Sequence, residues 1–371
     1  MADLVLGVGT SHGPLLNTPP DDWGLRAAAD RANPALVYRG EEYPYDELLA
    51  LRAPGFAAAC EPDARRSRHT ACRAHIEELG RRIKAAELDV LVVVSSDHKE
   101  VFGDELLPQF AFYWGDTMRH EPFTQEQLDR MKPGLAVAEV ANVPAVGTVR
   151  AGDAELARYL IEHTSAAGFD PAASRELPPG EWGNSGIPHG WGFVFEQVLG
   201  GGEAPPTVPV FVNTFWEPNP PSARRCFDFG VALGEAIRSY PRDLRVGIVA
   251  SGGLSHFVVD EELDRAFLTA LTGRDTGHLC ALPDAVLRSG TSEMRNWIVV
   301  AGALQAPPLQ AAATPGPAVP GASVPAASPL AAELIGYEPC YRSEAGTGCA
   351  MAFMTWQADS LPDTAGSGEA S

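Results

Sequence analysis

Short apolar runs that stop abruptly in polar residues recur along this chain. The clearest spans residues 88–94, Leu-Asp-Val-Leu-Val-Val-Val, and is followed by two serines, Asp97 and His98. A Val-rich run of this length with polar residues behind it is typical of a buried strand. Ligands of open α/β sheets gather beyond the carboxyl ends of the strands. An Asp-His pair could also begin a solvated loop. The choice between a loop and a functional site depends on whether other strands of the chain also end in a histidine.

The same construction appears at two further predicted strands. Residues 3–9 precede Thr-Ser-His12-Gly-Pro, where the Gly-Pro pair forces a turn, and residues 245–250 precede Ser-Gly-Gly-Leu-Ser-His256. A fourth histidine, His189, stands in Pro-His-Gly-Trp-Gly, and its flanking glycines permit close approach of backbone or ligand. Histidines placed by chance would not favour strand ends. We therefore expect these imidazoles to meet at one edge of a sheet.

Between these strands the apolar residues return with helical spacing. Ile76, Leu79 and Ile83 fall at i, i+3 and i+7 and predict a helix over residues 63–86. Similar patterns predict helices over 124–142, 153–167, 222–239 and 261–271, and strands over 110–114, 207–216 and 348–356. Strands that alternate with helices indicate the α/β class. We predict a three-layer sandwich around a mostly parallel, mixed central sheet, with the active site at the carboxyl edge of its strands.

The domain organisation follows from composition. Residues 1–304 and 333–357 carry the periodic patterns and are predicted to form a single catalytic domain. Residues 305–332 are rich in Ala and Pro and lack charge, which predicts a flexible insertion. The polar residues 358–371 are predicted to be a disordered tail.

The charge balance narrows the partners of the chain. The sequence has 28 Lys and Arg against 48 Asp and Glu, a net charge of −20, which argues against nucleic acid or an anionic membrane as the main partner. No run reaches the roughly 18 apolar residues of a membrane-spanning helix, and the N-terminus lacks a signal-like pattern. The six cysteines form no CxxC pair and indicate reduced thiols. We expect a soluble, cytoplasmic protein.

Glu293 supplies a candidate carboxylate for the same edge. It follows Gly-Thr291-Ser292 and precedes an apolar run, so Thr291 or Ser292 is predicted to cap a helix with Glu293 in its first turn. A purely capping role is one interpretation. The other is a ligand, because two imidazoles and one carboxylate suit non-haem Fe(II) that must bind O₂ and substrate together. Zinc accepts the same ligands, which leaves the metal open at this point. Any remaining histidines are then candidate acid–base groups.

Taken in chain order, five motifs resemble one family. They are Thr-Ser-His12-Gly-Pro, Asp-His98 after a Val-rich strand, Pro-His189-Gly, Gly-Gly-Leu-Ser-His256, and Glu293 four residues before a tryptophan. Across residues 3–304 they resemble the type III extradiol ring-cleaving dioxygenases, the superfamily of the protocatechuate 4,5-dioxygenase catalytic subunit. The resemblance implies that His12, His98 and Glu293 hold Fe(II), that His256 is the acid–base catalyst, and that His189 lines the pocket and assists. It also implies insertion of both atoms of O₂ into an aromatic diol, with ring opening.

Two features bear on the substrate. The segment covering residues 39–49 is similar to the gallate and 3-O-methylgallate branch of that family. The family usually has Asn-Asp-His at the second ligand, whereas this chain has Ser96 before Asp97 and His98. The shorter side chain removes a hydrogen bond that the Asn would make, so the identity of the diol stays open. Arg295, Arg342, Tyr337 and Tyr341 are candidates for binding a substrate carboxylate, or else surface or interface residues.

Two other functions fit parts of the pattern. A zinc-dependent hydrolase could use the same ligands, although the chain has no HExxH helix. A non-catalytic binding protein could share the scaffold, because fold does not fix function, but it would be expected to have lost part of the ligand set. We therefore expect an Fe(II)-dependent extradiol dioxygenase whose partners are a small aromatic diol and O₂, and which forms a homo-oligomer, a dimer.

Overall fold

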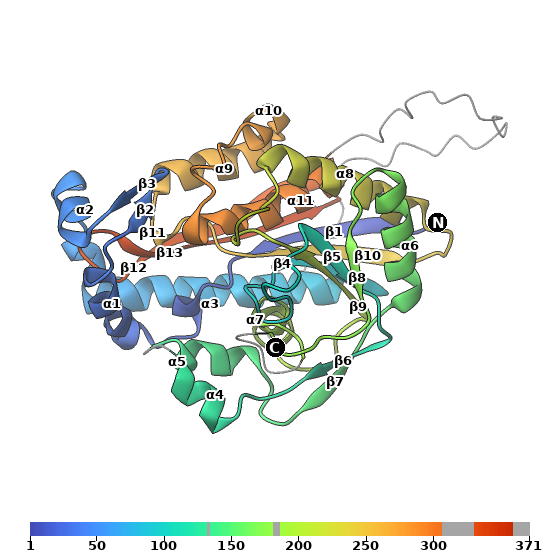
Figure 1. The fold of residues 1–371 in the computed structure, drawn as a ribbon, viewed down its shortest axis with the longest axis horizontal. Coiled ribbons are helices and arrows are strands. Elements are labelled where there is room, and N and C mark those ends of the chain that lie inside the picture. Colours follow the sequence, from blue (N-terminus) through green and yellow to red (C-terminus); the bar gives the residue numbers. More distant parts are fainter. Residues whose placement is uncertain (132–133, 181–185, 306–329, 359–371) are drawn as a thin grey trace, which may run out of the picture.

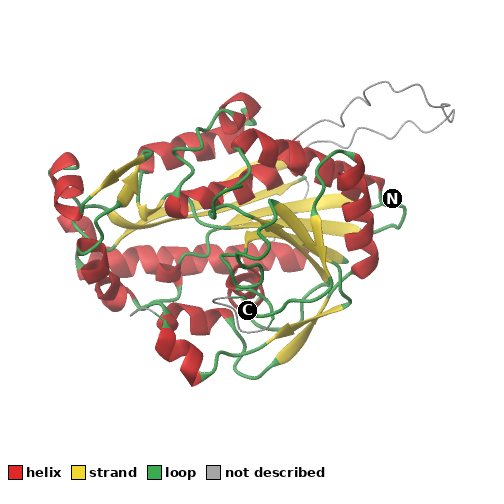
Figure 2. Ribbon diagram, viewed as in Figure 1, coloured by secondary structure: helices red, strands yellow, loops and turns green. Residues whose placement is uncertain are grey.

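Three layers make up the structure (Figure 1). The computed structural model describes residues 1–131, 134–180, 186–305 and 330–358. A central sheet lies between three helices on one side, α8 (Ala223–Ser239), α9 (Glu261–Gly273) and α11 (Met294–Gln305), and the long helix α3 (Pro62–Ala85) on the other (Figures 1 and 2). The predicted α/β class and the three-layer arrangement are confirmed.

The central sheet contains nine strands of the described residues, in the order β11-β13-β1-β10-β4-β9-β5-β8, with β12 also paired to β13. They are β1 (Asp3–Thr10), β4 (Val90–Ser96), β5 (Phe110–Tyr113), β8 (Ala172–Ser174), β9 (Thr207–Val212), β10 (Arg245–Ser251), β11 (His256–Val258), β12 (Ala331–Tyr341) and β13 (Thr347–Gln357). The middle strands β1, β10, β4 and β9 run parallel, whereas β13 is antiparallel to β1, β11 and β12. The predicted mixed sheet with a parallel centre is therefore present.

The alternation of side chains along β4 explains why its Val-rich run is buried on both faces. Val90, Val92 and Val94 join the core that contains α8 (Ala223–Ser239) and α11 (Met294–Gln305). Leu91 and Val93 point the other way, into the core that contains α3 (Pro62–Ala85). Each such side chain contributes roughly 1.5–3 kcal/mol on burial. Helices α8 and α11 approach so closely that a Cβ at Gly230 would overlap the carbonyl oxygen of Val299.

The remaining helices cover the edges of the sheet and the loops. They are α1 (Ala27–Arg31), α2 (Tyr45–Leu51), α4 (Gln125–Arg130), α5 (Ala136–Glu139), α6 (Ala154–Ala166), α7 (His189–Phe193), α9 (Glu261–Gly273) and α10 (Thr276–Cys280). Short 3-10 helices lie at Pro14–Leu16, Pro20–Arg26, Ala57–Cys60, Val140–Asn142 and Ser289–Glu293, and a π-helical turn lies at Val194–Val198. Two small two-stranded antiparallel sheets pair β2 (Leu36–Tyr38) with β3 (Glu41–Tyr43) and β6 (Thr117–His120) with β7 (Thr148–Ala151).

Two predictions about elements need correction. The helix predicted over 124–142 is broken into α4, α5 and a 3-10 turn, because Met131 is extended and Gly134 has φ +77°, outside helical values. Strand β12 begins at Ala331, two residues inside the segment predicted as an insertion. The other helices predicted over 63–86, 153–167, 222–239 and 261–271 are confirmed as α3, α6, α8 and α9.

Most of the predicted insertion and tail, residues 306–329 and 359–371, lie outside the described residues. The division into one catalytic domain, an insertion and a tail therefore stays a prediction. Among the helices that the structure describes, none is long and apolar enough to cross a membrane. All six cysteines are free thiols.

Candidate metal centre

Parallel pairing brings the predicted histidines to one edge of the sheet. His12 follows β1, His98 follows β4, and His256 opens β11 after the short loop that leaves β10. Strand β10 lies between β1 and β4 and pairs with both, so that its last residue, Ser251, is level with Thr10 and Ser95. The three chain segments beyond these ends start side by side, which is why their side chains meet.

Glu293 lies at the centre of this group and is only 2% exposed. Its Oε1 atom is 3.2 Å from His12 Nε2 and 2.7 Å from His98 Nε2. Its Oε2 atom is 3.7 Å from His256 Nε2 and accepts a hydrogen bond of 2.5 Å from the backbone N–H of Gly253. The structure thus brings together three predicted histidines around one predicted carboxylate.

The local environment of Glu293 differs from the predicted helix cap. Glu293 ends the 3-10 turn that precedes α11, Thr291 Oγ1 donates to the carbonyl of His256, and Ser292 Oγ has no partner among the described residues. Burial would raise the pKa of Glu293, but the charge of His12 and the hydrogen bonds of His12 and His98 hold it well below its usual range. The carboxylate therefore belongs to the imidazole cluster and caps nothing.

Hydrogen bonds behind two of the imidazoles fix which nitrogen faces the centre. Ser251 Oγ donates to the carbonyl of Gly190 (2.7 Å), so it must accept from His12 Nδ1 (2.9 Å). His256 Nδ1 likewise donates to the carbonyl of Leu254 (2.9 Å). With Nδ1 engaged in these hydrogen bonds, Nε2 is the nitrogen that each ring presents to Glu293.

This donor set fits a divalent cation. An imidazole lone pair and a carboxylate oxygen that face each other repel unless a proton or a cation lies between them. As they stand in the described part of the chain, no three or more His, Cys, Asp or Glu side chains are arranged so that they could hold a metal ion. Neighbouring ligands of one ion are themselves about 3 Å apart, since each lies about 2.1 Å from the metal, so the contacts at 2.7 and 3.2 Å are compatible with shared coordination.

His189 also reaches the site, from the start of α7. Its ring centroid is 4.8 Å from that of His12 and 5.7 Å from that of His98. Its Nδ1 hydrogen bonds to the carboxylate of Glu100, which also accepts from the His189 backbone N–H (2.8 Å). Burial would lower the pKa of His189, but the charge and hydrogen bond of Glu100 raise it to about 10. A side chain at Gly190 would overlap Ser95 Oγ, as expected from the predicted need for close approach.

The loop after β4 carries both His98 and Glu100. His98 and Lys99 have φ values of 49° and 63°, in the left-handed region that non-glycine residues seldom adopt. The Asp97 carboxylate accepts from the backbone N–H groups of Val101 and Phe102, both at 2.8 Å, and so closes the loop. Burial and the charge of Glu100 raise the pKa of Asp97 to about 7. Asp97 is thus a positioning residue, and Glu100, two residues beyond His98, was not among the predicted site residues.

Ser96, where the family usually has Asn, is tied into the sheet. Its Oγ lies 2.9 Å from Thr214 Oγ1 and accepts from Asn296 Nδ2 at 3.0 Å. Asn296 Nδ2 also donates to the carbonyl of Ser251 (3.1 Å), which links α11 to β10. The side chain of Ser96 is therefore engaged with the segment that follows β9 and with α11.

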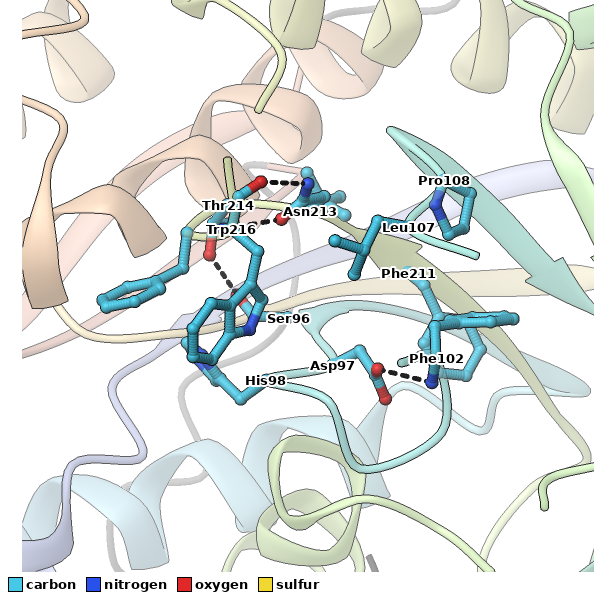
Figure 3. Close-up of a pocket in the computed structure, with 12 residues that line it drawn as sticks. Ser96, Asp97, His98, Phe102, Leu107, Pro108, Phe211, Asn213, Thr214 and Trp216 are labelled. Carbon is cyan, nitrogen blue, oxygen red and sulfur yellow. Dashed lines mark hydrogen bonds between the residues drawn. The ribbon is translucent and has the colours of Figure 1, made fainter. Parts of the chain in front are cut away.

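An aromatic pocket adjoins His98 (Figure 3). The space among its lining residues amounts to about 310 Å³, a figure that includes open solvent. His98 and Trp216 lie on one side in this view, with Phe102 and Phe211 across from them. The ring of Phe215 meets His98 edge-on, with centroids 5.9 Å apart. Aromatic side chains with a few polar groups among them are the kind of lining that sites for small aromatic molecules have.

Three of the four residues considered for a substrate carboxylate bond elsewhere. Arg295 is buried and donates to the carbonyls of Thr214, Pro221 and Leu287. Tyr337 donates to Asp264 (2.8 Å) and Tyr341 to Glu261 (2.6 Å), both on α9. These three side chains therefore support the fold. Arg342 pairs with Asp30 but keeps one nitrogen without a partner among the described residues.

Comparison with known proteins places this geometry in context. Residues 54–315 match the family model described as the catalytic LigB subunit of aromatic ring-opening dioxygenase. A gallate dioxygenase of Pseudomonas putida is 34% identical over 178 residues, covering 44% of this chain and 48% of that protein.

Two enzymes named 2,3-dihydroxyphenylpropionate/2,3-dihydroxicinnamic acid 1,2-dioxygenase are also similar. The one from Comamonas testosteroni is 29% identical over 170 residues, covering 45% of this chain and 43% of that protein. The one from Klebsiella pneumoniae is 29% identical over 195 residues, covering 52% and 51%. The chain spans about half the length of these curated relatives.

Proposed function

Because this chain belongs to the family of catalytic LigB subunits of aromatic ring-opening dioxygenases, we propose that it is an extradiol dioxygenase dependent on non-haem Fe(II). It inserts both atoms of O₂ into a catechol- or gallate-type diol and opens the ring. The observation that carries the proposal is the buried Glu293 carboxylate with the Nε2 atoms of His12, His98 and His256 around it.

In this proposal His12, His98 and Glu293 hold the iron. Two imidazoles and one carboxylate on one face leave coordination positions open, as non-haem Fe(II) oxygenases require. Bound there, Fe(II) supplies the redox chemistry that brings O₂ and diol together. The hydrogen bond from His12 Nδ1 to Ser251 and the loop closed by Asp97 hold the ligating rings in place.

The pKa values of the two other histidines are shifted in opposite directions, which suits them to opposite proton transfers. Burial lowers the pKa of His256, so its Nε2 is free to take a proton from the diol hydroxyl. His189 is held as a cation by Glu100 and can donate a proton or hydrogen bond to oxygen as the ring opens. This division between a neutral base and a charged acid follows the usual logic of paired catalytic groups.

The names of the relatives and the aromatic pocket support the substrate class. The rings of Phe215 and Trp216 and the adjoining Phe102 offer apolar faces to a planar ligand beside His98. The gallate dioxygenase relative points to a trihydroxybenzoate, and the other two point to a catechol with a carboxylate-bearing side chain. We infer a small aromatic diol as the substrate.

Uptake of O₂ by protein loaded with Fe(II) under anaerobic conditions tests the function. We expect O₂ consumption with gallate, 3-O-methylgallate or protocatechuate, and a change in absorbance as the ring opens. Metal analysis of the purified protein should find iron. Tightly bound zinc together with no O₂ uptake on any diol would contradict the proposal.

Substitution separates the roles of the histidines. His256→Ala should lower kcat by about 10²–10⁴-fold while iron stays bound, whereas His98→Ala should lose the iron. His163→Ala, an exposed histidine on α6, is the matched control and should leave both unchanged. Loss of iron in His256→Ala would show that the roles are assigned wrongly.

We further propose that the enzyme acts in the cytoplasm as a homodimer. The six free thiols are compatible with a reducing compartment, since Cys72 Sγ and Cys340 Sγ lie 3.9 Å apart without a bond. Light scattering coupled to size-exclusion chromatography measures the assembly directly.

A further inference from the structure

A fully buried carboxyl group on α9 holds the residue that precedes His256. Asp264 Oδ1 accepts a hydrogen bond from the backbone N–H of Ser255 (2.9 Å), and Oδ2 accepts one from Ser255 Oγ (2.6 Å). Oδ2 also accepts from the hydroxyl of Tyr337, on β12, at 2.8 Å. Two hydrogen bonds from one residue to the two oxygens of one carboxyl group fix the orientation of that residue as well as its distance.

The remaining polar groups of Ser255 are also paired. Its Oγ accepts from the backbone N–H of Asp260 (2.7 Å), and its carbonyl accepts from the backbone N–H of Ala350, on β13 (3.0 Å). Ser255 is only 1% exposed. A buried polar network in which every member is paired is rigid. Ser255 therefore cannot shift without breaking hydrogen bonds to the start of α9 and to β13.

His256 follows this fixed residue directly and opens β11. Its Nδ1 hydrogen bonds to the carbonyl of Leu254 (2.9 Å), and its Nε2 lies 3.7 Å from Glu293 Oε2. The ring lies close against the backbone on two sides, because a Cβ at Gly253 would be 2.5 Å from it and a Cβ at Gly290 only 2.1 Å. The place of Nε2 in the centre therefore depends on what holds the start of β11.

The burial of Asp264 has no other explanation in its contacts. It makes no ion pair with any residue that the structure describes, and the hydrogen-bonding cap of α9 is Asp260, which accepts from the backbone N–H of Leu263. Burying a carboxyl group without a cation costs free energy unless its hydrogen bonds compensate. Here two of the three hydrogen bonds end on Ser255. What the chain gains from this carboxyl group is a fixed position for the residue before His256.

We propose that Asp264 is a positioning residue for the reaction: through Ser255 it holds His256 Nε2 where this atom takes the proton of the diol. The inference rests on the proposed function, in which His256 is the base. A base acts only within hydrogen-bond reach of the proton that it removes. Misplacement of a reacting group by about 1 Å can lower a rate by about 100-fold. None of the contacts of Asp264 involves His12, His98 or Glu293, so its role concerns proton transfer and not metal binding.

Asp264→Asn tests this role with two diols, because an amide has almost the shape of a carboxyl group but only one acceptor oxygen. For protocatechuate, kcat should fall at least about tenfold, while KM and the affinity for Fe(II) change less than about twofold. In 4-nitrocatechol the nitro group makes a hydroxyl far more acidic, so that its ionisation depends less on a base. Its kcat should therefore fall less than about threefold. An equal fall for both diols would overturn the proposal, since general damage to the fold affects them alike.

A second variant and a matched control keep the test independent of the folding of Asp264→Asn. Ser255→Ala removes the contact from Oγ but keeps the backbone N–H that bonds to Asp264, and it should show the same contrast between the two diols. Tyr341→Phe is the control, because Tyr341 also joins β12 to α9, but through Glu261 (2.6 Å). It should leave kcat unchanged for both diols. Equal kcat values in Ser255→Ala and Tyr341→Phe would contradict the positioning role.

Binding of protocatechuate to the iron-loaded protein without O₂ keeps the two proposals distinguishable. Ionisation of the diol changes its ultraviolet spectrum, and this change should be smaller in Asp264→Asn than in the wild type. If it is smaller although no diol is turned over, the positioning role stands and only the proposed activity fails. If the ring is opened but kcat and the spectrum are the same in both proteins, only the positioning role fails. Without turnover and without a spectral difference, both fail.

Discussion

At the scale of single residues, the site depends on groups that never touch a substrate. Ser251 Oγ accepts a hydrogen bond from His12 Nδ1 and donates one to the carbonyl oxygen of Gly190, so that Nε2 is the nitrogen of His12 that faces the centre. Asp97 plays the equivalent part for His98 by closing the loop that holds it. Such supporting contacts are expected to govern metal affinity as well as orientation.

Ser251→Ala tests this dependence. The variant removes the acceptor for Nδ1 and lets the His12 ring turn or change tautomer, so the affinity for Fe(II) should fall by about 10–100-fold. Affinity is measured by anaerobic titration with a competing chelator. Ser292→Ala is the matched control, since Ser292 Oγ is equally buried and has no partner among the described residues. Unchanged affinity in Ser251→Ala would mean that His12 is oriented by packing alone.

The sequence could predict those site residues whose role is indicated by their immediate neighbours along the chain. His12, His98 and His256 could be found because an apolar strand ends immediately before, or one short loop before, each of them. Glu100 could not, because its role arises from a contact with His189, 89 positions away along the chain. The capping interpretation of Glu293 used only its neighbours, whereas its actual partners are brought by β1 and β4.

At the scale of elements, Asp264 joins three segments around His256. From α9 it accepts from the backbone N–H and the Oγ of Ser255, at 2.9 and 2.6 Å, and from Tyr337 of β12 at 2.8 Å. Ser255 immediately precedes His256, so the position of β11 depends on this buried carboxyl. Burial and the charge of Asp260 raise the pKa of Asp264 to about 7. The hydrogen bonds from Ser255 and Tyr337 lower this pKa but do not cancel the rise.

This shift predicts how stability depends on pH. A carboxyl whose pKa is higher in the folded state binds its proton more tightly there. Its contribution is therefore complete below the unfolded pKa of about 4 and is lost as pH rises to about 7. Each pKa unit between the two states corresponds to roughly 1.4 kcal/mol. Urea unfolding of wild type and Asp264→Asn from pH 4.5 to 8 should show the difference in unfolding free energy shrinking with pH. Asp63→Asn, at an exposed carboxylate, should show no such trend.

Elements with long periodic patterns were predictable, and those fixed by distant pairing were not. Helix α3 and strand β4 carry their own apolar periodicity, so their sequence suffices. Strand β12 has few buried residues in its first half and owes its place to pairing with β13, beyond the reach of a local pattern. The break between α4 and α5 follows from Gly134, whose positive φ overrides the helical spacing around it.

At the scale of the whole molecule, the centre joins parts of the chain that are far apart in sequence. His12, His98 and Glu293 extend from β1, from β4 and from the turn before α11, and His12 and Glu293 are 281 positions apart. In the sheet, β1 and β4 lie on either side of β10. Helix α11 packs on one face of the sheet. A metal held by all three residues would connect two strands with the helical layer.

Binding of the metal should therefore stabilise the entire fold. A ligand that binds only the folded state at 100 times its Kd adds about 2.7 kcal/mol, which corresponds to about 2–4 °C or more in Tm for a chain of this size. Anaerobic thermal unfolding should show Tm rising with Fe(II) and falling when a chelator removes it. His98→Ala should abolish the rise, whereas His163→Ala should retain it. A Tm that is insensitive to Fe(II) in a protein that still consumes O₂ would contradict this prediction, because it would mean that the ion binds the folded and the unfolded chain equally well.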